Sequence, residues 1–141
     1  MLRAYTKETA LSEKFEAMVN LGERNSRMKD FFDVWLLAQR FEFQGAPLSQ
    51  AIAATFARRK TVIPTDFPVG LSARFADDPS KVTQWKAFWR KVVRKEPIPD
   101  FPQVVGTARE FLIPAATAAR TQESWNAHWI KGGPWRRGAS D

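Results

Sequence analysis

The segment that most constrains this chain is residues 27–42, which carry apolar side chains almost all the way round a helix. Its apolar members are Phe31, Phe32, Val34, Trp35, Leu36, Leu37 and Phe41. A helix without a polar face must be covered by other elements. Ser26 is suited to cap its N-terminus, and Gly45 is suited to end it. We therefore expect a helical bundle in which this helix is the central, buried element.

A helix is also predicted just before this segment, over residues 6–22. Thr6 has the side chain of an N-cap, and Gly22 suits the left-handed backbone that commonly follows a helix. Phe15 and Met18 lie along one side of this helix. The two helices should form a hairpin whose apolar sides meet.

Proline and aspartate mark the starts of further helices. Pro47 suits the first turn of a helix through about residue 59. Asp78 suits the N-cap of a helix that begins at the next residue. A last helix is expected over about 102–119, interrupted at Pro114, because proline removes a helix hydrogen bond.

These segments predict one all-α domain over residues 1–141, a bundle of about five to six helices. In chain order it comprises a helical hairpin plus a third helix (6–60), a connector (61–78), two further helices (79–120) and an irregular, tryptophan-rich tail (121–141). No convincing strand pattern appears apart from the short TVI segment. The sequence lacks a secretory signal and a run long enough to span a bilayer, so we expect a soluble, cytoplasmic protein.

Each helix of the hairpin carries one charged residue on its apolar side. Lys14 lies there on the first helix, and Asp30 lies there on the second. A buried charge without a partner is strongly unfavourable, so two interpretations stay open. In the first, the two residues form a structural ion pair beside a surface network of Arg27, Lys29 and Asp33. In the second, they line a cleft in which a ligand or another domain supplies the opposite charge.

The excess of positive charge lies in the middle of the chain. Lys and Arg number 7 against 7 Asp and Glu in residues 1–45, 10 against 3 in 46–95, and 5 against 5 in 96–141. Such a block suits an anionic partner, with nucleic acid or a phosphorylated ligand ahead of a membrane, and a solvated basic face is the alternative. The candidate phosphate or nucleic-acid patch consists of Arg58, Arg59, Lys60, Lys86, Arg90 and Arg94.

Composition excludes several kinds of site. The chain has no cysteine and one histidine, His128, so neither a structural zinc site nor a cysteine–histidine nucleophile is available. The GGPW segment lacks the following helix and the Lys-Ser/Thr pair of a phosphate loop. The tryptophans have structural interpretations. Trp35, Trp85 and Trp89 should belong to the core, and Trp125, Trp129 and Trp135 should fasten the tail to the helices.

Several segments together resemble a known family. They are YTKETALSEKFEAMVNLGERNSRMKDFFDVWLL, ATFARRKTVIP, FADDPSKVTQWKAFWRK, FLIPA and HWIKGGPW. From about residue 5 to 137, the chain resembles the C-terminal part of the AbiEii/AbiGii-type nucleotidyltransferase toxins. The EKFEAM and SRMKDFFDVW segments are the most specific.

The resemblance implies a two-lobed enzyme of the DNA polymerase β-like superfamily. Such an enzyme transfers a nucleotide from an NTP to an RNA acceptor, tRNA 3′ ends for some members, with Mg²⁺ as the metal of the complete enzyme. It also implies a toxin of type IV toxin–antitoxin and abortive-infection systems. Lys14 matches the lysine of the third family motif, which contacts the nucleotide phosphates. Asp30 matches the acidic residue of the KDxxD-like fourth motif that activity requires, and Arg27 and Asp33 would support it.

One family motif is missing from this sequence. It is a Gly-Ser pair followed by a metal-binding Asp-x-Asp, and the nearest acidic pair, Asp77-Asp78, precedes a proline that opens a helix. Without those carboxylates there is no two-metal clamp for the attacking hydroxyl and the leaving pyrophosphate. We expect no metal site in this chain and no nucleotide transfer by the chain alone. A truncated gene, half of a split enzyme and an isolated helical lobe all fit this pattern.

The alternative function is a non-enzymatic interaction module. In that case the Lys14–Asp30 pair is structural, and the chain binds an antitoxin or the missing N-terminal lobe. An apolar surface left for that partner should then favour self-association.

Overall fold

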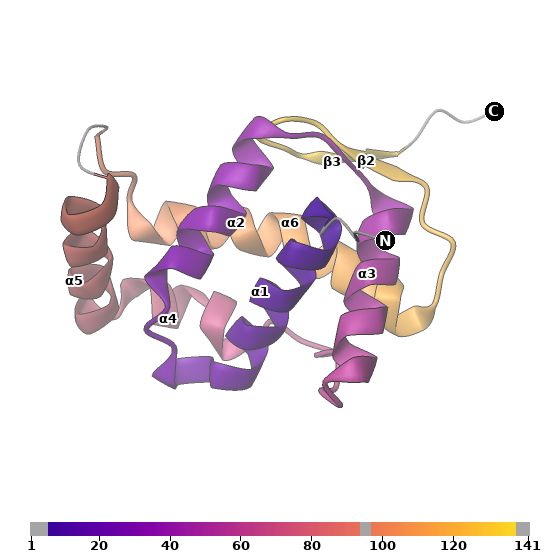
Figure 1. Ribbon diagram of the computed structural model, residues 1–141, viewed down its shortest axis with the longest axis horizontal. Coiled ribbons are helices and arrows are strands. Elements are labelled where there is room, and N and C mark those ends of the chain that lie inside the picture. The colour runs from indigo at the N-terminus through magenta and orange to yellow at the C-terminus, as the bar shows by residue number, and fades with distance from the viewer. Residues whose placement is uncertain (1–5, 94–96, 138–141) are drawn as a thin grey trace, which may run out of the picture.

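Helix α6 (Phe101–Thr121) is the longest element and lies behind the other large helices in Figure 1. The computed structural model describes residues 6–93 and 97–137. In front of α6 lie α1 (Lys7–Leu21), α2 (Met28–Arg40) and α3 (Gly45–Arg58). Helices α2 and α3 contact α6 directly, and α1 packs against α3 and α2.

Two shorter helices lie toward one end of the molecule. They are α4 (Ala73–Asp77), which contacts α6, and α5 (Pro79–Phe88), which contacts α2 and stands at the left of Figure 1. The other short elements are the 3₁₀ turns Gly22–Arg24 and Val69–Leu71, the π-helical turn Trp89–Val93, and the strands β1 (Phe43–Gln44), β2 (Ala127–Trp129) and β3 (Trp135–Arg137). The predicted all-α class is confirmed by these helices, with a small sheet added.

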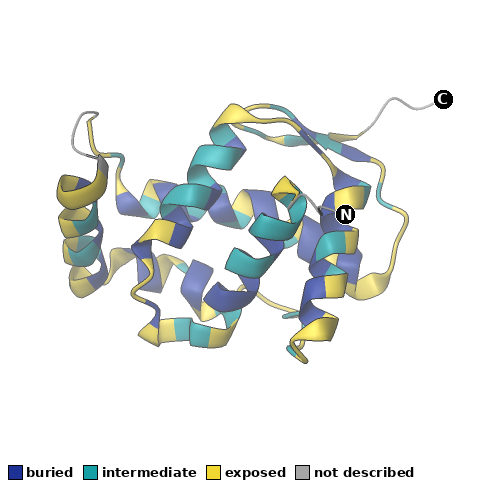
Figure 2. Cartoon of the chain, viewed as in Figure 1, coloured by how far each residue is buried: buried dark blue, intermediate teal, exposed yellow. Residues whose placement is uncertain are grey.

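Buried side chains from four helices meet in one core. Phe15 of α1, Phe31 of α2, Ile52 of α3 and Phe111 of α6 are each 0% exposed. Figure 2 shows the buried residues on the inward faces of these helices. Aromatic contacts join the elements, for example Phe15 with Phe56 at a ring-centroid distance of 5.4 Å. The core therefore holds together helices that are distant in the sequence.

Helix α2 is less enclosed than its sequence predicts. Trp35, Leu36 and Leu37 are half-buried, and Phe41, just after the helix, is 43% exposed. The reason is its position in the front layer, where α1 and α5 flank it and leave one side open (Figure 1). The expectation of a fully surrounded helix was wrong.

The ends of α2 also differ from the prediction. Ser26 is not its N-cap. The helix begins at Met28, and the side-chain Oδ1 of Asn25 accepts a hydrogen bond of 2.9 Å from the Arg27 N–H. Gly45 does not end α2 but begins α3, because the chain leaves α2 after Arg40 to form β1. A Cβ at Gly45 would lie 2.7 Å from the Trp125 ring, so glycine permits that indole to pack there.

The predicted caps of α1 and α5 are confirmed. Thr6 Oγ1 accepts a hydrogen bond of 3.0 Å from the Thr9 N–H, and Gly22 follows α1 with a φ of 56°. Asp78 Oδ1 accepts a bond of 2.9 Å from the Ser80 N–H at the start of α5. This backbone hydrogen bond lowers the pKa of the Asp78 carboxyl.

The end of α5 departs from regular helical spacing. The α-helix ends at Phe88 and a π-helical turn follows over Trp89–Val93. A wider turn rotates later residues away from the expected stripe, so Val92 is 56% exposed while Trp85 and Trp89 are buried. The predicted row Lys86, Arg90 and Arg94 is therefore broken, and Arg94 lies outside the described residues.

Two segments are more regular than predicted. The connector contains α4, capped by Ser72 Oγ, which accepts a bond of 3.1 Å from the Phe75 N–H. Five residues are too few to show a helical period in the sequence. Helix α6 continues through Pro114 without interruption. Buried neighbours on both sides of Pro114, among them Phe111 and Ala115, hold that helix against the core.

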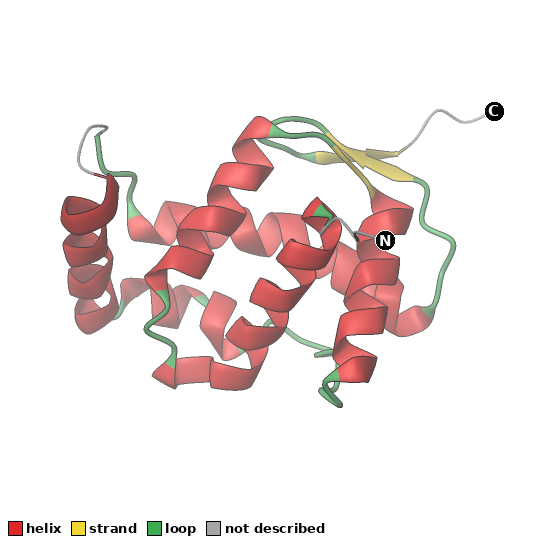
Figure 3. Cartoon of the chain, viewed as in Figure 1, coloured by secondary structure: helices red, strands yellow, loops and turns green. Residues whose placement is uncertain are grey.

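The tail is not irregular. Strand β2 pairs antiparallel with β1 and β3, with Phe43 opposite Trp129 and Trp129 opposite Trp135 (Figure 3). These strands have two or three residues, too short for apolar alternation to reveal them. The prediction that the tail tryptophans fasten it to the helices is confirmed. Trp129 Nε1 donates to the Ala38 carbonyl at 2.9 Å, and Trp135 Nε1 donates to the Phe111 carbonyl at 2.9 Å.

Among the described helices, none combines the length and the apolar character that crossing a bilayer requires.

We expect Trp129→Ala to lower the free energy of unfolding by about 3–5 kcal/mol. The indole is 1% exposed, and its loss would leave a cavity and an unpaired Ala38 carbonyl. Urea unfolding followed by circular dichroism measures the change. Arg136→Ala, on the exposed neighbouring strand, is the control and should change stability little. Equal stability of the two variants would show that the tail is not fastened by Trp129.

Candidate functional site

The two displaced charges of the helical hairpin come together in the structure. Lys14 of α1 places its Nζ 3.6 Å from Asp30 Oδ1 and 3.1 Å from Asp33 Oδ2, both on α2. The Asp30 side chain is 6% exposed and the Lys14 side chain 24%. Asp30 and Asp33 meet the same lysine because residues three apart lie on one edge of a helix. The lysine therefore bridges α1 and α2 through both carboxylates.

Two further cations complete this cluster. Arg27 Nε lies 2.9 Å from Asp30 Oδ2, and Lys29 Nζ lies 2.8 Å from Asp33 Oδ2. The Arg27 contact is an ion pair without hydrogen-bond alignment, because Asp30 Oδ2 has no hydrogen-bond partner among the described residues. Both carboxylates are thus neutralised by side chains of the chain itself.

A pocket of about 320 Å³ opens beside Lys14. Its charged lining consists of Lys14, Arg27, Arg59 and Glu13, and its small residues are Ala10 and Ala17. The three cations come from α1, from the link before α2, and from the end of α3. Three cations against one carboxylate make this pocket suited to an anionic group.

Arg59 is a pocket residue that the sequence assigned to a different surface. Its Nη1 lies 3.3 Å from Glu16 Oε1, and Glu16 is 1% exposed. Glu16 Oε2 also accepts a bond of 2.7 Å from Thr61 Oγ1. The apolar pattern placed Glu16 off the buried stripe of α1, so only the packing of α3 against α1 reveals this buried carboxylate. It holds Arg59 at the pocket.

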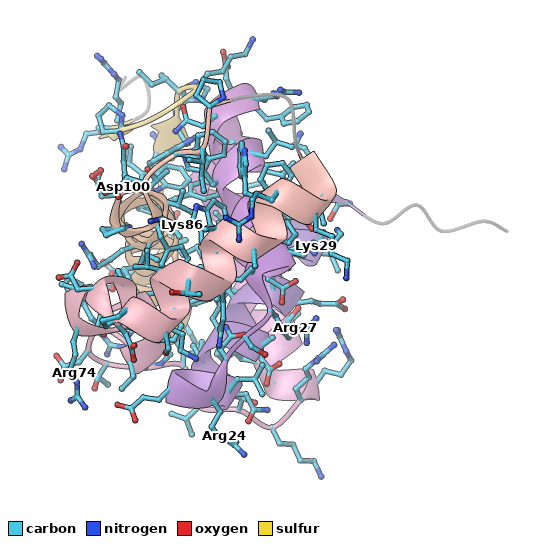
Figure 4. All side chains as sticks on the ribbon, turned by 90° about the vertical axis from the view of Figure 1, so that its left-hand side faces the viewer. Arg24, Arg27, Lys29, Arg74, Lys86 and Asp100 are labelled. Atoms are coloured by element: carbon cyan, nitrogen blue, oxygen red, sulfur yellow. The ribbon has the colours of Figure 1, made fainter. Side chains whose placement is uncertain are left out.

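The six predicted patch residues do not form one surface. Arg58 and Arg59 lie at the end of α3, at the opposite end of the molecule from α5 with Lys86 and Arg90 (Figure 1). Arg58 also forms an ion pair of 3.1 Å with Glu13. Lys60 is exposed. Figure 4 shows Arg27 and Lys29 along one side of α5 and Lys86 on the other.

The described residues do not fit a resident metal ion. No cluster of three or more His, Asp or Glu side chains able to hold one occurs in residues 6–93 and 97–137. Asp30 and Asp33 are paired with lysine and arginine, which compete with a cation for them. His128 lies in the sheet, 3.2 Å from both Glu42 Oε1 and the Gln44 amide, away from this cluster.

A comparison with protein families identifies the class of this chain. A model of the family described as nucleotidyl transferase AbiEii toxin, type IV TA system, matches residues 1–107. The chain belongs to this family. The matched region includes the charge cluster and helices α1 to α5, while β2 and β3 lie beyond it. Searches of curated proteins and of solved structures gave no match.

A double-mutant cycle on the hairpin pair measures how strongly the charges are coupled. We expect Lys14→Met to lower the free energy of unfolding by about 1–3 kcal/mol, because it leaves the buried Asp30 with Arg27 as its remaining ion-pair partner. Adding Asp30→Leu should restore most of that loss, since no buried charge remains unpaired.

The measurement is urea unfolding of both single variants and the double variant. Lys29→Met, which removes an exposed partner of Asp33, is the control and should have little effect. Additive losses for Lys14→Met and Asp30→Leu would contradict coupling between these two residues.

Proposed function

We propose that this chain is the helical, nucleotide-binding lobe of a nucleotidyltransferase toxin, and that the Lys14 pocket holds the phosphates of an NTP. The observation that carries the proposal is the convergence of Lys14, Arg27 and Arg59, from three separate elements, on one pocket. Cations with several donors on one concave surface suit a polyphosphate, which presents several oxygens at short spacing. Membership in the AbiEii family supports the same ligand class.

In this proposal the carboxylates position the cations. Asp30 and Asp33 hold the Lys14 ammonium at the mouth of the α1–α2 hairpin, and Asp30 also holds Arg27 by its Nε. The guanidinium fork of Arg27, whose side chain is 59% exposed, remains free to contact phosphate oxygens. Loss of Asp30 would then act on binding through both cations.

The complete transfer reaction requires groups from outside this chain. An acceptor hydroxyl of an RNA, tRNA being the expected class, attacks the α-phosphorus of the NTP. The bond to the β,γ-pyrophosphate breaks, and the hydroxyl proton leaves to a base. Mg²⁺ would stabilise these oxygens, but the described residues offer it no site, and the sequence has no Asp-x-Asp segment. We propose that a partner lobe supplies those carboxylates and that this chain alone transfers no nucleotide.

Binding of ATP and of inorganic tripolyphosphate by isothermal titration calorimetry tests the pocket. Lys14→Ala, Arg27→Ala and Arg59→Ala should each weaken both ligands by about tenfold or more, because each removes a charged donor. Affinity should also fall steeply as salt rises, because each bound phosphate replaces counterions.

Arg120→Ala, an exposed arginine on α6, is the matched control and should leave binding unchanged. Circular dichroism shows that each variant is folded. Wild-type affinity in the Arg59→Ala variant would remove Arg59 from the site. Unchanged affinity in all three pocket variants would overturn the proposal. Transfer of labelled nucleotide to RNA by the purified chain would contradict its dependence on a partner lobe.

A second candidate function, a protein-interaction module, is favoured by one observation. The segment before α4 exposes three large apolar side chains, Val62 at 83%, Phe67 at 61% and Val69 at 47%. Exposed apolar residues that are close in the chain are typical of an interaction surface. The partner would be the nucleotidyltransferase lobe or an antitoxin, and self-association would be the behaviour of the chain alone.

Light scattering after size-exclusion chromatography tests this surface. If it drives self-association, Val62→Ser with Phe67→Ser should shift the chain toward the monomer without lowering its melting temperature, because both side chains face solvent. Val19→Ser, a half-buried residue of α1, serves as the control for a general loss of apolar contacts. An unchanged distribution of species would count against self-association through this segment.

A further inference from the structure

A second pocket lies on the other side of Arg27, between the start of α2 and α5. It measures about 510 Å³, and Arg27 lines both this pocket and the Lys14 pocket. Its other lining residues are Ser26, Met28, Lys29, Asp30, Gln84, Ala87 and Phe88. A group bound there would lie next to the phosphates of a ligand held by Lys14 and Arg27.

The unpaired polar atoms of the structure gather at this pocket. Among the described residues, the buried side-chain atoms without a hydrogen-bond partner are Asn25 Nδ2, Asp30 Oδ2 and Gln84 Oε1. Two of these residues line the pocket, and Asn25 precedes the segment that forms its wall. Buried polar atoms are nearly always paired, so such a group at a pocket points to a bound partner.

Gln84 is the side chain best placed to contact a ligand. It is half-buried, and no hydrogen bond joins its amide to another described residue. Its Oε1 is shielded, but rotation about the terminal torsion of glutamine is soft and turns either polar atom toward the pocket. An amide that can both donate and accept suits the edge of a nucleobase, which presents donors and acceptors side by side.

Phe88 supplies the apolar part of the pocket. Its ring packs against Trp85 with centroids 5.7 Å apart and against Phe32 at 5.9 Å, which holds it in place. Aromatic rings at a pocket wall are the usual stacking surface for bases. Lys29, whose side chain is 70% exposed, lies beside Arg27 at the same pocket and adds positive charge for a phosphate (Figure 4).

We propose that this second pocket takes a nucleobase, with Gln84 reading its hydrogen-bonding edge and Phe88 contacting its face. Gln84 is then a specificity-determining residue. The inference rests on the proposed binding of nucleotide phosphates beside Lys14. The base comes either from the NTP or from an unpaired end of the RNA acceptor, and both present the same chemistry to the pocket.

Calorimetric titration of the full chain with ATP, GTP, CTP, UTP and inorganic tripolyphosphate tests this assignment. The wild-type chain should prefer one nucleotide by about tenfold over the weakest, as a well-placed amide allows. Gln84→Ala should abolish that preference and leave tripolyphosphate binding unchanged. Phe88→Leu should weaken all four nucleotides without affecting tripolyphosphate. Gln103→Ala, an exposed glutamine on α6, is the control.

A second series with short homopolymeric RNAs distinguishes the source of the base. A preference that depends on Gln84 among the RNAs, and not among the NTPs, assigns the pocket to the acceptor. The reverse assigns it to the NTP. Gln84→Ala should not lower the melting temperature, because it removes a polar group that has no partner.

Two results would overturn the inference. One is equal preference in wild-type and Gln84→Ala chains for both ligand series. The other is a lower melting temperature of Gln84→Ala together with parallel losses for tripolyphosphate, which would make Gln84 a structural residue. Failure of the proposed function is distinct. In that case tripolyphosphate does not bind, while base preference that depends on Gln84 persists.

Discussion

The buried carboxylate of Asp30 is the group on which the functional end of this molecule depends. It sits on α2 with its side chain 6% exposed, and it meets Lys14 from α1 and Arg27 from its own first turn. A carboxylate so enclosed is stable only with cations beside it, so its position dictates where both cations lie. The α1–α2 link, the start of α2 and the face of α1 are therefore fixed relative to one another by electrostatics as well as by packing.

This arrangement places positive charge at two neighbouring pockets. Lys14 and Arg59 belong to one, Lys29 and Gln84 belong to the other, and Arg27 lies between them. A polyphosphate and its base are joined by a sugar, so a ligand of that kind requires two adjacent pockets of different chemistry. The cation-rich pocket and the amide-and-aromatic pocket have that difference. The chain thus presents a surface for nucleotide recognition, whereas the chemistry of transfer needs carboxylates that it lacks.

Much of the helical framework could be predicted, because it depends on local interactions. The caps at Thr6 and Asp78 each involve a bond to a backbone N–H two or three residues away, and such bonds are visible as sequence patterns. The unusual positions of Lys14 and Asp30 were visible for the same reason, since each residue's place on its helix follows from spacing alone. The errors fell at Ser26, Gly45 and Val92, where a neighbouring segment or a π turn changed the outcome of the local pattern.

The sequence by itself determined the helices and the displaced charges on the hairpin, because these follow from helical period and capping. Only the tertiary structure decided which residues share a pocket. Arg59 joined Lys14 because α3 packs against α1, and Gln84 met Asp30 because α5 packs against α2. The same holds for the sheet, in which Phe43 pairs with Trp129 across most of the chain. Such contacts depend on how whole helices pack, and no local spacing specifies that.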